Sequence, residues 1–164
     1  MAKAAIVILA GNESHADYGR LANALEAAKE FAENDDDELE LIFDGAGTQW
    51  IPELEDEESD YHELYQAVRD DAAVCDYCSG AFGVDEAVAD AGLVTLDEYD
   101  GHPSIRSLVD DDYEIITFLA ARPVKPHSRF YRRSHLASDC RYLRPVVAVA
   151  GRDGLITASG HLPT

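Results

Sequence analysis

The sequence predicts an α/β fold, with a mostly parallel sheet of four to five strands and helices on both faces. Short apolar runs rich in β-branched residues alternate along the chain with segments whose apolar residues recur at helical spacing. The first apolar run, at 4–10, contains no polar residue, which is typical of a central strand that is covered on both faces. Alternating strands and helices favour crossover connections and therefore a parallel sheet.

Each expected element has its own pattern. After the strand at 4–10, Ser14 or Asp17 predicts a helix start, and apolar residues at helical spacing extend that helix to about residue 33. The further expected elements are a strand at 39–47 that ends in a glycine turn, a loop at 48–58, a helix from Ser59 or Asp60 to Val68, a strand at 72–80, a helix at 84–92, a loop and a short helix at 93–109, and a strand at 113–120.

The net charge is −20 and is unevenly distributed. Residues 1–118 hold 5 basic and 31 acidic residues, a charge of −26, whereas residues 119–164 hold 8 and 2, a charge of +6. Such an acidic body excludes non-specific binding to nucleic acid, and its regular apolar pattern excludes a disordered acidic tail. An acidic surface of this kind predicts a salt-loving source, because in molar salt the Debye length falls to about 3 Å and the repulsion is screened.

The charge reversal predicts two parts. Residues 1–118 form the α/β domain, and residues 119–164 form a basic extension with a possible hairpin at 146–160, or else a non-native tail. No apolar run approaches the roughly 18 residues of a membrane span, so no membrane partner is expected. Three cysteines without a secretion signal predict free thiols and a cytoplasmic location.

The pair Cys75-x-x-Cys78 has four interpretations. A structural zinc site needs four ligands and usually two such pairs; since only Cys140 remains, no metal is expected. A thioredoxin-like redox pair lies at a helix N-terminus, whereas this pair is expected along and just past a strand. In the third interpretation, both cysteines are structural and behave as buried apolar residues. In the fourth, one of them is a nucleophilic thiolate.

The thiolate interpretation follows from position, because open α/β sheets bind ligands at the carboxyl ends of their strands. The next helix start, near 83–85, is expected to lower the thiol pKa. His15 and Asp44 also follow strands and are candidate accessory residues, although an exposed loop histidine and a plain turn are the simpler interpretations. His102 is expected at the surface. The glycines at 45 and 47 lack the rest of a dinucleotide fingerprint, so no cofactor is expected.

The order of elements resembles the DsrE/DsrF-like family of small sulfur-relay proteins over roughly residues 4–118. The resemblance is carried by "LELIFDGAG", by "VCDYCSGAFGVDEAVADAGL" with its cysteine at the end of the third strand, and by "YEIITF". It implies a three-layer sandwich, a homotrimer or homohexamer, and a cysteine that accepts sulfane sulfur as a persulfide and passes it to a partner protein. Cys75 is the preferred carrier over Cys78. Phe82 departs from the pattern, because many members have an arginine there.

The leading hypothesis is therefore a cytoplasmic sulfur carrier with sulfur donor and acceptor proteins as partners. A non-catalytic oligomeric scaffold or small-ligand-binding protein with structural cysteines is the alternative from another class. A dithiol oxidoreductase, which requires a disulfide between Cys75 and Cys78, is the third.

Overall fold

A five-stranded sheet forms the centre of the protein in the computed structural model, which describes residues 1–120. Every strand pairing is parallel, and the order is β4-β3-β2-β1-β5. The strands are β1 (Lys3–Ile8), β2 (Glu38–Phe43), β3 (Ala72–Cys75), β4 (Val94–Leu96) and β5 (Glu114–Phe118). The predicted fold class is confirmed. The predicted hairpin at 146–160 and most of the predicted basic extension lie outside the described residues.

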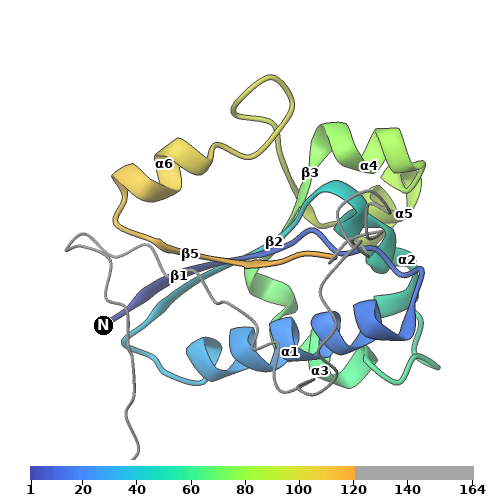
Figure 1. Cartoon of the computed structure of the whole chain (residues 1–164), viewed down its shortest axis with the longest axis horizontal. Coiled ribbons are helices and arrows are strands. Elements are labelled where there is room, and N and C mark those ends of the chain that lie inside the picture. The colour runs from blue at the N-terminus through green and yellow to red at the C-terminus, as the bar shows by residue number, and fades with distance from the viewer. Residues whose placement is uncertain (121–164) are drawn as a thin grey trace, which may run out of the picture. The chain divides into compact units, whose positions relative to one another are not determined.

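Helices cover both sides of this sheet. The helical elements are α1 (His15–Ala32), α2 (Ile51–Leu54), α3 (His62–Gln66), α4 (Asp76–Phe82), α5 (Asp85–Ala91) and α6 (Ile105–Asp110), with 3₁₀ turns η1 (Gly45–Trp50) and η2 (Arg69–Asp71). In Figure 1, α1 and α3 lie on one side of the strands and α6 on the other. The arrangement is that of a three-layer α/β sandwich.

The main hydrophobic core lies on one face of the sheet. It joins alternate strand residues to apolar residues of α1, α2, α3 and α5, because side chains alternate between the faces along a strand. Its largest members are fully buried: Ile6, Ile8, Leu21, Leu25, Leu41, Phe43, Trp50, Ile51, Leu54 and Tyr65. The intervening strand residues point to the opposite face, which carries Ala5, Val7, Ile42, Ala73 and Cys75.

The prediction of a loop at 48–58 was wrong in its first half. This segment forms the end of η1 and the helix α2. Trp50 is fully buried and its Nε1 donates a hydrogen bond of 2.8 Å to the carbonyl of Ala10. Gly47 packs so closely on β1 that an added Cβ would lie 2.0 Å from the carbonyl oxygen of Ile8. Acidic neighbours hid this short apolar pattern in the sequence.

Two further boundaries differ from the predictions. The strand expected at 72–80 ends at Cys75, where α4 begins, and residues 94–96 form an edge strand where a loop was expected. A three-residue strand is too short to display a period. In the part of the chain that the structure describes, no helix combines the length and the apolar character needed to cross a membrane.

Candidate functional site

The two predicted cysteines lie where β3 ends. Cys75 is the last residue of the strand and Cys78 lies one turn into α4. Cys75 is fully buried and Cys78 is 9% exposed; both are free thiols. The pair therefore lies at the end of a strand and just past it, as expected. The helix that begins at Asp76 was not expected there, and it places the pair at a helix N-terminus as well. Tyr77, which lies between the two cysteines on α4, is 60% exposed.

Asp44 lies beside Cys78, as its position after β2 predicted. Its Oδ1 accepts a hydrogen bond of 2.7 Å from the backbone N–H of Gly45, which holds the carboxylate at the end of the strand. The same oxygen accepts one of 3.3 Å from the Cys78 thiol. The second candidate accessory residue, His15, is exposed at the first position of α1 and is not part of this group.

His102 completes the group. It was expected at the surface and is half-buried, and its contact with the thiols was not expected. Its Nδ1 lies 3.2 Å from Sγ of Cys75 and 3.9 Å from Sγ of Cys78. The histidine belongs to the β4–α6 loop (residues 97–104). Because β4 was not predicted from the sequence, its following loop was not recognised as one that returns to the carboxyl edge of the sheet.

The β4–α6 loop contacts Cys75 at the end of β3 and Tyr77 in the first turn of α4. The backbone N–H of Tyr77 donates a hydrogen bond of 2.8 Å to the carbonyl of Gly101, and that carbonyl also accepts from the Cys75 thiol at 3.7 Å. The rings of Tyr77 and His102 pack with their centroids 4.8 Å apart. A backbone bridge joins Tyr99 and His102. Together they orient the imidazole toward the sulfur atoms.

One ligand atom from each of Asp44, Cys75, Cys78 and His102 lies within 4.8 Å of all the others. The four residues come from the ends of β2 and β3, the first turn of α4 and the β4–α6 loop. We call them the Cys–His–Asp cluster. Two of its members were predicted as site residues by their cysteine spacing and one by its place after a strand; His102 was not.

Burial dominates the electrostatics of this cluster. It raises the pKa of the Cys75 thiol well above its ordinary value, and hydrogen bonding to Asp44 and Cys78 raises it further. The pKa of Cys78 is also raised, first by burial and then by its hydrogen bond to Asp44. The expected lowering of the thiol pKa is therefore not the net result. Within residues 1–120, no lysine or arginine is hydrogen bonded to either thiol.

This geometry is compatible with three kinds of chemistry. A thiol beside an imidazole is the arrangement of a nucleophile and its base. Two neighbouring thiols can form a disulfide. Two sulfurs, one nitrogen and a carboxylate match the ligands that zinc takes in proteins.

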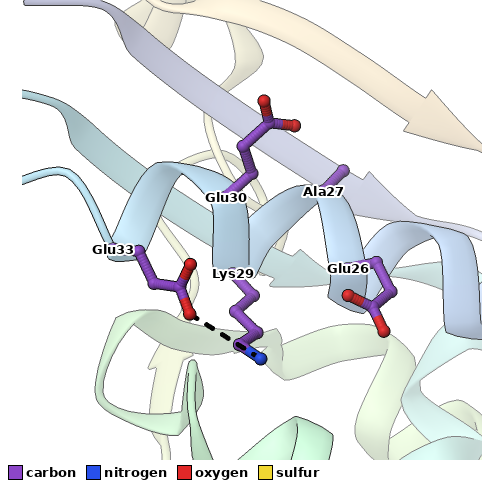
Figure 2. Close-up of a pocket in the computed structure, with 5 residues that line it drawn as sticks. All are labelled: Glu26, Ala27, Lys29, Glu30 and Glu33. Atoms are coloured by element: carbon purple, nitrogen blue, oxygen red, sulfur yellow. Dashed lines mark ion pairs between the residues drawn. The ribbon is translucent and has the colours of Figure 1, made fainter.

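A surface pocket elsewhere carries no comparable chemistry. It lies along the C-terminal half of α1 and is lined by Glu26, Ala27, Lys29, Glu30 and Glu33 (Figure 2). Lys29 pairs with Glu33 across 3.7 Å, and no thiol, hydroxyl or imidazole lines the pocket. It belongs to the solvated acidic face of the helix, and the Cys–His–Asp cluster remains the candidate site.

Comparisons with known proteins find relatives of unknown function. An uncharacterised protein of Methanocaldococcus jannaschii is 30% identical over 80 residues, which are 49% of this chain and 65% of that protein. The match thus spans less than two thirds of the relative. A solved structure of a conserved protein of unknown function from Bacteroides thetaiotaomicron has a TM-score of 0.43 and 13% identity, over 69% of this chain and 93% of that one. No family model matches the chain.

Proposed function

We propose that this chain is a cytoplasmic sulfur carrier of the DsrE/DsrF-like kind, with Cys75 holding the persulfide. The observation that carries the proposal is the distance of 3.2 Å between Sγ of Cys75 and Nδ1 of His102, at the carboxyl end of a central parallel strand. A raised pKa keeps the Cys75 thiol protonated, which opposes nucleophilic attack. A base in direct contact with the thiol can remove that proton during the reaction.

The transfer step is a thiol–persulfide exchange. His102 takes the proton of Cys75, and the thiolate attacks the outer sulfur of a donor persulfide, R–S–SH. The donor S–S bond breaks, a new S–S bond forms on Cys75, and the released thiolate R–S⁻ takes the proton back from the imidazolium. The net change is Cys75–SH and R–S–SH to Cys75–S–SH and R–SH, with no outside oxidant. Delivery to an acceptor thiol is the reverse exchange.

Access to Cys75 depends on the β4–α6 loop, because the thiol is fully buried beneath it. The loop is attached to α4 by few contacts, chiefly those of Gly101 and His102. A donor protein that displaces it would reach Cys75 and Cys78 together. Phe82, which replaces the arginine of many family members, is 43% exposed at the end of α4 and contributes no charge to the site.

The decisive test is persulfide formation on metal-free protein. In a Cys140→Ser background with chelator present, glutathione persulfide should add about 32 Da to the intact mass. Cys75→Ser should abolish the adduct and Cys78→Ser should retain it. His102→Gln should slow loading by at least about 10-fold, because a positioned base is lost. His15→Gln, an exposed histidine outside the cluster, is the matched control.

Two outcomes would contradict the proposal. If the parent protein forms no adduct, it does not accept sulfane sulfur and the proposed carrier function is wrong. An adduct that persists in Cys75→Ser and disappears in Cys78→Ser would assign the carrier to the other thiol.

A structural role for the cysteines is the competing function, and the complete burial of Cys75 favours it. Alkylation of the folded protein at neutral pH distinguishes a structural role from sulfur transfer, since structural thiols react only on unfolding.

The neighbouring thiols also favour a dithiol oxidoreductase. That activity requires a reversible disulfide between Cys75 and Cys78, seen as a loss of about 2 Da in mass.

The family resemblance also implies a homotrimer or homohexamer, and the acidic composition implies a salt-loving source. Exposed large apolar residues such as Val94 and Leu119 are available for contacts between copies. Light scattering in molar salt tests the oligomer, and unfolding as a function of salt tests the adaptation.

A further inference from the structure

The Cys–His–Asp cluster has the ligand set of a transition-metal site. It offers two thiols, one imidazole nitrogen and one carboxylate, all within 4.8 Å of one another. Soft sulfur ligands select zinc over magnesium or calcium, which prefer oxygen. Sequence spacing did not reveal this set, because only two of its members form a Cys-x-x-Cys pair. The other two arrive from β2 and from the β4–α6 loop.

The distances fit a tetrahedral ion. Zinc–sulfur bonds of about 2.3 Å and zinc–nitrogen or zinc–oxygen bonds of about 2.0 Å require ligand atoms roughly 3.3 to 3.8 Å apart. Sγ of Cys75 is 3.2 Å from Nδ1 of His102, and Sγ of Cys78 is 3.3 Å from Oδ1 of Asp44. The cross distance from Cys78 to His102 is 3.9 Å. Since every pair of ligand atoms lies within 4.8 Å, contractions of at most about 1.5 Å complete the geometry.

The ligands are held from outside as metal ligands usually are. The Gly45 N–H binds the Asp44 carboxylate, and the Tyr77 ring packs on the imidazole of His102. The carbonyl of Gly101 lies against the Cys75 sulfur and is itself bound by the Tyr77 N–H. Gly101 has φ +83°, a conformation that side-chain-bearing residues rarely adopt. The backbone is therefore specialised where the loop brings His102 to the sulfur atoms.

The charges also call for a cation. Asp44 and the two cysteines can supply up to three negative charges, and within residues 1–120 no lysine or arginine forms an ion pair with Asp44. A divalent ion that displaces the thiol protons would balance these negative charges among ligands that are buried or half-buried.

We infer that Asp44, Cys75, Cys78 and His102 bind one Zn²⁺ ion tetrahedrally and that this ion clamps the β4–α6 loop to the carboxyl edge of the sheet. With four protein ligands the site is closed, as structural zinc sites are. The inference does not rest on sulfur transfer. It adds a consequence for that activity: zinc and a persulfide compete for the same two thiols, so zinc-loaded protein is closed to sulfur donors.

Cobalt substitution tests the inference on the full-length chain. One Co²⁺ per chain should give the intense visible bands of a tetrahedral ion and a thiolate-to-cobalt charge-transfer band in the near ultraviolet, and Zn²⁺ should bleach both. The charge-transfer band is needed because the acidic surface also binds cations through carboxylates, without sulfur.

Variants assign the ligands. Cys78→Ser, His102→Gln and Asp44→Asn should each weaken Co²⁺ affinity by at least about 100-fold, as loss of a ligand exceeds the 10–100-fold cost of an outer contact. His15→Gln and Asp36→Asn, both at exposed positions, should bind as the parent does. Circular dichroism of the apo variants separates lost binding from lost folding, and Asp44→Asn preserves shape where a cysteine variant fails to fold.

Clear results overturn the inference. A cobalt complex without the thiolate band places the ion on the surface. If Asp44→Asn or His102→Gln binds Co²⁺ as tightly as the parent protein, that residue is not a ligand and the four-ligand site is wrong. The optical readout uses no sulfur donor, whereas the persulfide assay uses chelated protein, so either idea can fail while the other survives.

Discussion

The two faces of the sheet are built for different purposes. On the first, large side chains such as Ile8, Leu41 and Phe43 are fully buried beneath four helices. On the second, Ala5, Ala73 and Cys75 are small, and Val7 and Ile42 are the larger buried strand residues. The helix α6 on that side has no fully buried residue, and a pocket opens between it and β2 and β4.

The first face therefore provides most of the stability of the fold, and the second face carries the candidate site. Along β3, Val74 points into the main core while Cys75 points to the second face, where the Cys–His–Asp cluster forms. Most of the apolar burial that stabilises the fold lies on the first face, whereas the cluster on the second is covered by a loop with few attachments. Local opening of such a loop costs less free energy than unfolding the domain.

The largest expected effect tests the packing of the two faces. Phe43→Ala should lower the free energy of unfolding by about 3–5 kcal/mol, because it removes a fully buried ring from the first face. Leu108→Ala, at a half-buried position on α6, should cost only about 1 kcal/mol. Urea unfolding in molar salt measures both. Equal losses would mean that the second face is packed as tightly as the first.

The next effect concerns the loop that covers the cluster. Gly101→Ala should destabilise the domain by about 1–2 kcal/mol, because φ is +83° and the new Cβ would lie 3.2 Å from Cβ of Tyr77. It should also speed alkylation of Cys75 by loosening His102. Gly80→Ala is the matched control with the opposite sign: no atom lies within 4 Å of the new Cβ in α4, and stability should rise by about 0.5–1 kcal/mol.

A Gly101→Ala variant with parent-like stability and parent-like alkylation would contradict this account. The loop would then be free of strain and would not control access to the thiol.

The sequence predicted the first face better than the second. Long periodic signals, such as the buried face of α1 at Leu21, Leu25 and Ala28, identified the helix and its packing surface. The parallel sheet followed from alternation alone. Short elements without a period, notably β4, were not predicted. Because β4 was missed, the position of the loop that follows it was not predicted either.

The site was predicted in part for the same reason. Cys75, Cys78 and Asp44 directly follow or end strands, so topology brings them together at one edge. His15 also follows a strand, but β1 is two positions from β3 in the sheet and its histidine lies on the surface. His102 depends on a loop conformation set by Gly101, which no spacing in the sequence displays.

A smaller effect comes from the buried thiols. Because burial raises the pKa of Cys75 and Cys78, the folded chain keeps protons that the unfolded chain loses near the ordinary value of 9.0. Stability of the metal-free protein should therefore be complete below that pH and fall above it. Cys75→Ser should reduce this fall. Urea unfolding between about pH 7 and pH 10 measures the slopes, and the difference between parent and variant isolates the thiol from tyrosines that titrate nearby.

Parallel slopes in parent and variant would indicate that the Cys75 thiol ionises equally well in the folded state. The second face would then be open to water at the cluster, contrary to the burial on which the contrast between the faces depends.

The smallest effect lies on the exposed side of α1, which is the same helix that packs the first face. Lys29 and Glu33 pair across 3.7 Å with side chains 40% and 68% exposed (Figure 2). Lysine precedes glutamate here, the weaker orientation for a pair four residues apart. Lys29→Ala should therefore change stability by less than about 0.5 kcal/mol in dilute buffer and by nothing measurable in molar salt, where screening removes the attraction. Urea unfolding at both salt concentrations checks this. If Lys29→Ala lowers the free energy of unfolding by more than about 1 kcal/mol in molar salt as well, the acidic surface stabilises the fold directly. The contrast between the two faces of the sheet would then not explain where the stability of the fold comes from.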